Sequence, residues 1–344
     1  MSARSSIVRA VVPVAAVAAV AVVAALAATL STACSAPPTL ALRPLAPARA
    51  SDVTAGVDHR TGAFRGTGGV MLFEQSWRPV GARPRAVLVI HHGLKSHSAH
   101  YAELAGRLVA RGFAVHAYDM RGHGRSAGQR ATLGDFADLT ADLDLFLRRV
   151  RRAEPGLPVF LAGHSVGGAV VTLYTLEYRP ALAGLLLLAP ALRVDQPPIA
   201  AGAAGVAGAL TPSFPAVDVP DELFSRSEAV RRDMARDPLI YHPPGPARTA
   251  RGLTRALVRI WARAGELDVP LLGLHGTADR ATSPRGTAEL VRRARTGDRT
   301  LLLYRGLYHD LVREPERDQV MTDIERWLER RTPRQVSARP GQRN

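Results

Sequence analysis

Hydrophobic residues follow two different patterns along the chain. Short runs that are apolar at almost every position, such as 183–188, are typical of strands buried on both faces of a sheet. Longer stretches, such as 133–152, repeat their apolar residues at helical spacing. The alternation of the two patterns predicts an α/β fold with a mainly parallel sheet flanked by helices. We expect strands at 70–77, 86–92, 113–118, 158–161 and 183–188 and in the first parts of 269–279 and 300–309, and helices at 101–111, 133–152, 169–178 and 319–330.

One long segment interrupts this alternation. Its first part, 197–216, is rich in alanine, glycine and proline, whereas 221–240 and 247–264 have the polar or amphipathic patterns of helices. An insertion of this kind predicts a helical cap beside the sheet, placed after the strand that follows the helix at 169–178. The resulting division is a core formed by 61–190 and 269–331 and a cap formed by 191–268.

The amino-terminal residues have the layout of an export signal. Arg4 and Arg9 precede an uncharged apolar run, 10–30, that ends in small residues. At about 1.5 Å per residue this run is also long enough to cross a bilayer if it stays uncleaved. Cleavage and retention as a membrane anchor are both compatible with the pattern.

Cys34, the only cysteine of the chain, directly follows Leu30-Ser31-Thr32-Ala33. This order resembles the site at which bacterial lipoproteins are cleaved and lipidated, although the leucine lies one place further from the cysteine than is usual. We interpret 1–34 as a lipoprotein-type export signal with Cys34 as the lipid anchor; an unmodified cysteine in an ordinary signal or anchor is the alternative. A proline- and alanine-rich linker, 35–60, follows, and 332–344 is expected to be a disordered tail.

The composition excludes several classes of function. The formal charge is +15 at pH 7, but the arginines are scattered and no nucleic-acid-binding motif accompanies them, so we expect no nucleic-acid partner. The histidines show no zinc-ligand spacing, and no dinucleotide or P-loop fingerprint is present. The sequence therefore predicts neither a metal site nor a cofactor.

The segment Gly163-His164-Ser165-Val166-Gly167 fits the G-x-S-x-G pattern of a nucleophile elbow. It lies between an apolar run and an amphipathic stretch, which predicts a strand, a sharp turn and a helix. Such a turn exposes a serine hydroxyl above the sheet, and its glycines leave room where side chains would collide. Ser165 is therefore the candidate nucleophile.

A catalytic serine needs a base and an acid that orients the base. In an elbow enzyme the acid follows the serine in the chain, and the histidine comes last. Asp279 ends the segment 269–279, and His309 follows the strand predicted in 300–309. Each residue alone is more simply a turn acid or a loop histidine. Three such residues in order, each past the carboxyl end of a predicted strand, indicate one triad, because that edge of an open α/β sheet carries its active site.

Acyl transfer also needs preset donors for the negative charge that develops on the carbonyl oxygen. The backbone N–H of Val166, directly after the nucleophile, is one candidate. The N–H of Leu94, after the strand at 86–92, is the other. We interpret the neighbouring His92 as a structural loop residue.

Together these segments resemble the monoacylglycerol lipase and lysophospholipase branch of the α/β-hydrolases. The resemblance runs from about 70 to 328 and rests on blocks in the family's order, namely His92-Gly93-Leu94, His97-Ser98, Tyr101, the block from Tyr118 to Ser126, and the elbow. It implies the α/β-hydrolase fold with Ser165 as nucleophile, Asp279 as acid, His309 as base, and an oxyanion hole from Leu94 and Val166. Val166 stands where the family usually has methionine.

The resemblance implies a serine hydrolase that cleaves carboxylic esters of lipids, above all monoacylglycerols or lysophospholipids, through an acyl-enzyme. The cap would then provide an apolar channel for an acyl chain. Its segment 199–210 is either a mobile lid that touches lipid or a hinge without substrate contact. A proline-specific aminopeptidase of the same fold and a non-catalytic binding lipoprotein are the alternatives.

The export signal and the resemblance together predict where the enzyme works. We expect it on the outer side of a bacterial membrane, held there by lipidated Cys34. Secretion, or anchoring by an uncleaved amino-terminal segment, are the alternatives.

Overall fold

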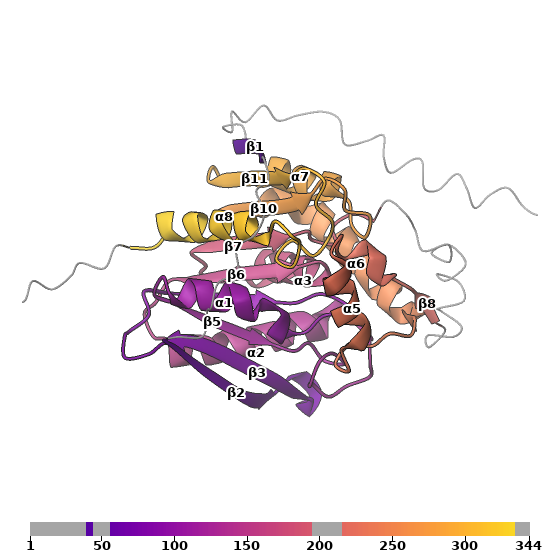
Figure 1. Ribbon diagram of the computed structural model, residues 1–344, viewed down its shortest axis with the longest axis horizontal. Coiled ribbons are helices and arrows are strands. Elements are labelled where there is room, and N and C mark those ends of the chain that lie inside the picture. Colours follow the sequence, from indigo (N-terminus) through magenta and orange to yellow (C-terminus); the bar gives the residue numbers. More distant parts are fainter. Residues whose placement is uncertain (1–38, 44–55, 195–214, 334–344) are drawn as a thin grey trace, which may run out of the picture. The chain divides into compact units, whose positions relative to one another are not determined.

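A nine-stranded sheet forms the centre of the protein, which we describe from a computed structural model at residues 39–43, 56–194 and 215–333 (Figure 1). Its strands are β1 (Thr39–Arg43), β2 (Val57–Arg65), β3 (Met71–Pro79), β4 (Ala86–His91), β5 (Phe113–Tyr118), β6 (Val159–His164), β7 (Gly184–Leu188), β10 (Leu271–Gly276) and β11 (Arg299–Tyr304). The strand order is β1-β11-β10-β7-β6-β4-β5-β3-β2. Neighbouring strands are parallel except that β3 runs antiparallel to both β5 and β2. The predicted mainly parallel sheet is therefore confirmed.

Helices cover both faces of this sheet, which explains why its central strands are buried at every position. Side chains alternate between the faces, so Val87 and Val89 of β4 join one hydrophobic cluster and Leu88 and Ile90 the other. The face of Leu88 is covered by α1 (Ala102–Val109) and α8 (Arg317–Arg330), which lie in front of the sheet in Figure 1. The opposite face is covered by α2 (Phe136–Ala153), α3 (Val166–Tyr178), α6 (Ala247–Arg263) and α7 (Pro284–Arg293).

Local chemistry fixes these helices in place. The Asp135 side chain caps α2 by accepting a hydrogen bond of 2.9 Å from the Ala137 N–H. On α8, the Trp327 ring packs edge-to-face on Phe160 with 6.0 Å between ring centroids. A Cβ on Gly184 of β7 would come within 2.4 Å of that ring, so the glycine allows the close approach of helix and sheet.

The inserted segment divides into two parts with different roles. β8 (Pro215–Val217), the short helix η4 (Asp221–Leu223) and α5 (Glu228–Arg236) form a small layer of their own, and β8 pairs with β9 (Gly245–Pro246). By contrast, α6 packs along α3 through residues such as Ala256 and Ile260. The amphipathic α6 therefore belongs to the helical layer on this face of the sheet, although its residues fall inside the predicted cap of 191–268.

Other differences from the sequence prediction also have physical causes. β1 lies within the predicted linker 35–60, and β2 begins inside it, at Val57. Most positions of β2 are exposed at the sheet edge, so the strand has no apolar run to reveal it. Helix α7 was not predicted, because it buries only two large apolar side chains, Leu290 and Val291.

Several predicted segments lie outside the described residues. They are the export signal 1–34 with Cys34, the segment 199–210 and most of the tail 332–344. Among the helices of the described ranges, none is both long and apolar enough to span a bilayer.

Candidate active site

Ser165 occupies the turn between β6 and α3. Its backbone has φ 55° and ψ −124°, a strained combination for a residue with a side chain. Two glycines make the turn possible. A Cβ on Gly163 would come within 2.5 Å of the Gly167 carbonyl oxygen, and one on Gly167 within 2.3 Å of the His91 carbonyl oxygen. The predicted strand–turn–helix arrangement is therefore present.

Asp279 and His309 lie together past the ends of β10 and β11. His309 Nδ1 lies 2.8 Å from Asp279 Oδ2, and both side chains are fully buried. Nδ1 also faces the Thr282 hydroxyl at 3.2 Å. In this geometry the carboxylate orients the imidazole by accepting a hydrogen bond from its Nδ1–H. The opposite nitrogen, Nε2, is left for a further group.

Further hydrogen bonds fix the Asp279 carboxylate. Its Oδ1 accepts from the backbone N–H groups of Ala281 and Thr282, at 2.8 and 3.0 Å. Its Oδ2 accepts from the Thr282 hydroxyl at 3.0 Å and also lies 3.0 Å from His275 Nε2. Neither His275 nor Thr282 is among the site residues predicted from the sequence. A histidine at the end of an apolar strand, four residues before the acid, is the feature that could have pointed to them.

Charge interactions favour the ionised aspartate and the protonated histidine. Burial alone would raise the pKa of Asp279, but the imidazoles of His309 and His275 hold it below its usual range. Burial alone would lower the pKa of His309, but the Asp279 carboxylate, helped by Asp310, raises it above the ordinary 6.5. The His164 ring lies 4.8 Å from that of His309, centroid to centroid, and burial lowers its pKa to about 4.

No hydrogen bond joins the side chains of Ser165 and His309. Among the described residues, neither Ser165 Oγ nor His309 Nε2 has a hydrogen-bond partner. Such contacts in hydrolases are often long without substrate and tighten when it binds. The two loops already touch, because His164 Nε2 lies 3.3 Å from the His309 carbonyl oxygen.

The amides of Leu94 and Val166 donate to no group in the described part of the chain. Val166 is the first residue of α3, where helix geometry leaves the N–H without an internal partner. The loop of Leu94 is fixed by His92, whose Nδ1 lies 2.8 Å from the Gly93 carbonyl oxygen and whose Nε2 accepts from the Met120 N–H at 2.8 Å. His92 thus has the structural position expected of it, and both amides remain available to an oxyanion.

Two contacts join the cap to the loops that carry the site. We call residues 217–240 the cap segment. Lys95, next to Leu94, forms an ion pair with Asp221. The Phe224 ring packs edge-on against the His309 ring with 5.5 Å between centroids. The cap segment therefore touches both the histidine and the loop of the candidate oxyanion hole.

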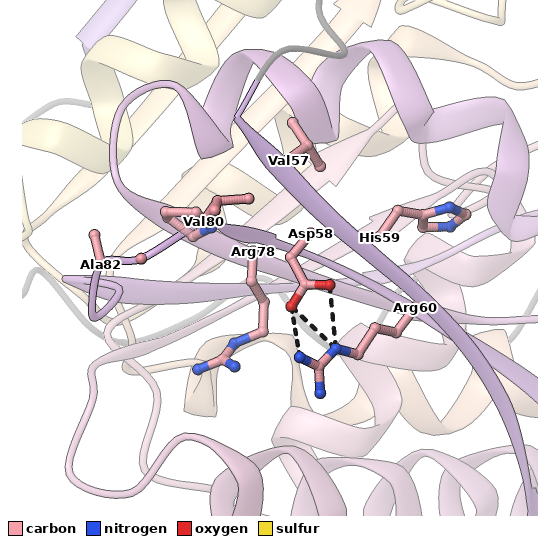
Figure 2. A pocket seen from close by; sticks show the side chains of 9 residues that line it. Val57, Asp58, His59, Arg60, Arg78, Val80 and Ala82 are labelled. Atoms are coloured by element: carbon pink, nitrogen blue, oxygen red, sulfur yellow. Dashed lines mark hydrogen bonds and ion pairs between the residues drawn. The ribbon is translucent and has the colours of Figure 1, made fainter.

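A hollow of about 720 Å³ lies elsewhere, at the ends of β2 and β3 (Figure 2). Its most prominent feature is an exposed ion pair between Asp58 and Arg60, with Arg78 beside it. Exposed pairs of this kind contribute little to stability. No predicted site residue lines the hollow, and three strands separate β2 from β6 in the sheet. We therefore do not assign it to the reaction.

Comparison with known proteins agrees with this geometry. Residues 82–316 match the family described as "Serine aminopeptidase, S33". The chain is 34% identical over 268 residues to the monoacylglycerol lipase of Mycolicibacterium smegmatis, which covers 77% of this chain and 95% of that protein. The chain belongs to this α/β-hydrolase family.

Other relatives of the hydrolase agree. It is 34% identical over 278 residues to the monoglyceride lipase of Homo sapiens, covering 79% of this chain and 91% of that one. The crystal structure of Paleococcus ferrophilus monoacylglycerol lipase superposes with a TM-score of 0.67 at 28% identity, covering 76% of this chain and 99% of that one. The hydrolase is thus an enzyme that cleaves lipid esters. The roles of its individual residues stay predictions.

The approach of Gly93 to the serine gives a first prediction. A Cβ at position 93 would lie 2.6 Å from Ser165 Cβ and 3.1 Å from the His164 carbonyl oxygen. Gly93→Ala should therefore displace the serine or the Leu94 loop, and ester turnover should fall by about 100-fold, as expected for a misplacement of about 1 Å. Gly297→Ala is the matched control, because nothing lies within 4 Å of its Cβ position. Equal activity of the two variants in an esterase assay would contradict the packing argument.

Proposed function

We propose that this hydrolase cleaves monoacylglycerols with Ser165 as nucleophile, His309 as general base and Asp279 as the acid that orients the base. The observation that carries the proposal is the buried hydrogen bond of 2.8 Å between His309 and Asp279, at the sheet edge where Ser165 is held in a strained turn. The names of the relatives, monoacylglycerol lipase and monoglyceride lipase, support an acylglycerol as substrate.

In the first half of the reaction, Ser165 Oγ attacks the ester carbonyl while His309 Nε2 takes the hydroxyl proton. Asp279 keeps the imidazole in the tautomer with hydrogen on Nδ1 and stabilises the imidazolium that forms. The N–H groups of Leu94 and Val166 bind the oxyanion. Each such donor typically contributes about 3–4 kcal/mol to the stability of the transition state.

The first half ends when the tetrahedral intermediate collapses to an acyl-enzyme. The alcohol leaves with the proton held by His309, and the acyl chain stays on Ser165. In the second half, His309 removes a proton from water, which attacks the acyl-enzyme, and then returns that proton to Ser165 Oγ as the fatty acid leaves. Both halves use the same oxyanion site, so no further residue is needed to complete the cycle.

Lysophospholipids and aminopeptidase substrates are the two alternatives to monoacylglycerols. Lysophospholipids carry the same acyl ester on a different head group and were expected from the sequence alongside monoacylglycerols. An aminopeptidase reaction is supported by the family description "Serine aminopeptidase, S33". Against it stand the lipase names of the relatives with the highest coverage quoted above, so we retain it as the second candidate.

For location, the proposal is a lipoprotein on the outer side of a bacterial membrane, anchored through Cys34. The support is the order of charged, apolar and small residues before Cys34. The net charge of +15 would add attraction to anionic lipid surfaces. Secretion and a retained amino-terminal anchor are the alternatives.

Ser165→Ala tests the function directly. We expect kcat on monoacylglycerols to fall on the order of 10⁶-fold, because the nucleophile is lost. A fluorophosphonate probe should label the wild type and not the variant, and Thr254→Ala, at an exposed position of α6, should behave as wild type. Lysophospholipids and aminoacyl amides are measured in the same assay. Unchanged ester turnover in Ser165→Ala would refute the mechanism, and faster cleavage of aminoacyl amides than of monoacylglycerols would favour the second candidate.

The raised pKa of His309 gives a pH prediction. The base must be neutral, so kcat/KM should rise with pH through a pKa above 6.5. Asp279→Asn removes the charge that raises this pKa, so the acidic limb should move to lower pH while kcat falls on the order of 10⁴-fold. Asp310 still faces His309 in this variant, and His164 is neutral in this range, since its pKa is about 4. Asp298→Asn, at an exposed position, serves as the control. If the acidic limb of Asp279→Asn lay at the same pH as that of the wild type, the role proposed for Asp279 would be contradicted.

The anchor is tested by labelling cells with a radioactive fatty acid. We expect the label in the wild-type chain and its loss in Cys34→Ala, because Cys34 carries the only thiol. Cell fractionation of both forms provides the second readout. A label that persists in Cys34→Ala would show that the fatty acid is attached to another residue.

A further inference from the structure

Two histidines of the core meet an aspartate of the cap segment close to the Leu94 loop. His97 directly precedes the short helix η3 (Ser98–Tyr101), and His100 lies within it. Asp237 directly follows α5 and caps its carboxyl end. His97 Nε2 lies 2.8 Å and His100 Nε2 3.4 Å from Asp237 Oδ2. The two rings are 4.0 Å apart, centroid to centroid. We call His97, His100 and Asp237 the His–His–Asp cluster; the mechanism above uses none of them.

The three side chains offer the geometry of a metal site. Their ligand atoms all lie within 4.8 Å of one another. Two imidazole nitrogens and one carboxylate oxygen form a ligand set that zinc takes in proteins, with bonds of about 2.0–2.2 Å and a fourth position left to water. Tetrahedral bonds of this length hold ligand atoms roughly 3.3 Å apart. The 3.4 Å between His100 and Asp237 fits this spacing, and the His97 contact has to lengthen by about half an ångström. The widest separation in the cluster, up to 4.8 Å, has to shorten when an ion binds.

The protonation states also suit a metal ion. Burial and the nearby Arg313 lower the pKa of His100 to about 3, so its imidazole is neutral at pH 7. Burial would raise the pKa of Asp237, but hydrogen bonds from His97 and from the Leu239 N–H hold it below its usual range. Neutral imidazole and ionised carboxylate are the forms that bind metal, and the imidazole hydrogens that face Asp237 leave when an ion binds.

Neighbouring groups orient two of the three ligands from behind, as in established metal sites, whereas His97 Nδ1 is buried without a partner among the residues that the structure describes. His100 Nδ1 faces the Ser96 hydroxyl at 3.0 Å, which leaves Nε2 directed at the cluster. Asp237 Oδ1 accepts the Leu239 N–H at 2.8 Å, which leaves Oδ2 for the ion. The loop of His97 is itself anchored, because the Ser98 N–H donates to buried Asp119 at 2.8 Å.

One positive charge opposes a cation at this place. The Arg313 guanidinium lies 3.5 Å from His100 Nδ1, on the side of the ring away from the cluster. It is also 3.4 Å from the Asp310 carboxylate, which offsets part of its charge. Removing this charge should therefore strengthen the binding of a metal ion. A substitution that only disturbs the structure around the cluster would instead weaken binding.

We propose that the His–His–Asp cluster binds a divalent transition-metal ion, for which Zn²⁺ is the best match, and that the bound ion ties the cap segment to the core. His97 and His100 come from the core and Asp237 from the cap, so the ion has to bridge them. A restrained cap slows exchange of substrate and product at Ser165. This second effect rests on the proposed function, whereas metal binding does not. His97 and Asp237 lie 140 residues apart in the chain, which is why sequence spacing predicts no metal site.

The test measures Zn²⁺ binding by titration calorimetry to the full-length chain, purified in detergent and without a histidine tag. We expect one ion per chain, and visible absorption of tetrahedral Co²⁺ at the same stoichiometry. His100→Ala and Asp237→Asn should each weaken binding at least tenfold, Arg313→Gln should tighten it, and exposed His59→Ala should leave it unchanged. Zn²⁺ should also raise the Tm of the wild type but not of His100→Ala.

The outcomes separate the two parts of the proposal. No binding by the wild type, or undiminished binding by both His100→Ala and Asp237→Asn, would overturn the site. His97→Ala should also weaken binding. If this variant does not fold, His100→Ala and Asp237→Asn still show whether the cluster binds Zn²⁺. Zn²⁺ should slow monoacylglycerol turnover by the wild type and not by His100→Ala, and chelation should reverse this. Binding without any effect on turnover would refute the restraint, and a folded chain that binds Zn²⁺ but cleaves no ester would refute the proposed function alone.

Discussion

The site depends on one backbone constraint, the strained turn at Ser165. A residue with φ 55° and ψ −124° is held only if the structure around it leaves no better choice. Here the close approach of α3 to β4 supplies that pressure, since Gly167 lies so near the His91 carbonyl oxygen that a methyl group would overlap it. The same packing brings Gly93, the residue before Leu94, against Ser165. The strand β6, the turn at Ser165 and the loop of Leu94 therefore constrain one another.

The second support is electrostatic. Asp279 accepts hydrogen bonds on both oxygens while it is buried between β10 and the loop of His309. An ionised carboxylate is costly to bury, and its stability here comes from backbone amides, a hydroxyl and two imidazoles. His275 thus helps to keep the aspartate charged, and the charged aspartate favours the His309 tautomer with hydrogen on Nδ1, which the proposed mechanism requires.

The sequence predicts the central features well because they are encoded locally. Ser165, Asp279 and His309 each follow a buried strand, so parallel topology alone brings them to one edge. Features that depend on tertiary packing were missed. Edge strand β2 has no apolar run, α7 buries few large side chains, and α6 has the pattern of a cap helix although it packs on α3. His275 and Asp237 gain their partners only when distant segments meet, which spacing along the chain does not show.

The contact of Lys95 with the cap segment has a practical meaning. Lys95 is the only lysine among 45 basic residues, and its ammonium group binds both the Asp221 carboxylate and, at 3.0 Å, the Val219 carbonyl oxygen. The other residues of this count are arginines, and a guanidinium does not react with amine-selective reagents. Apart from the amino terminus, acylation or reductive methylation therefore addresses a single atom of the protein. That atom joins the loop of Leu94 to the cap segment, so its reactivity reports how often the two separate.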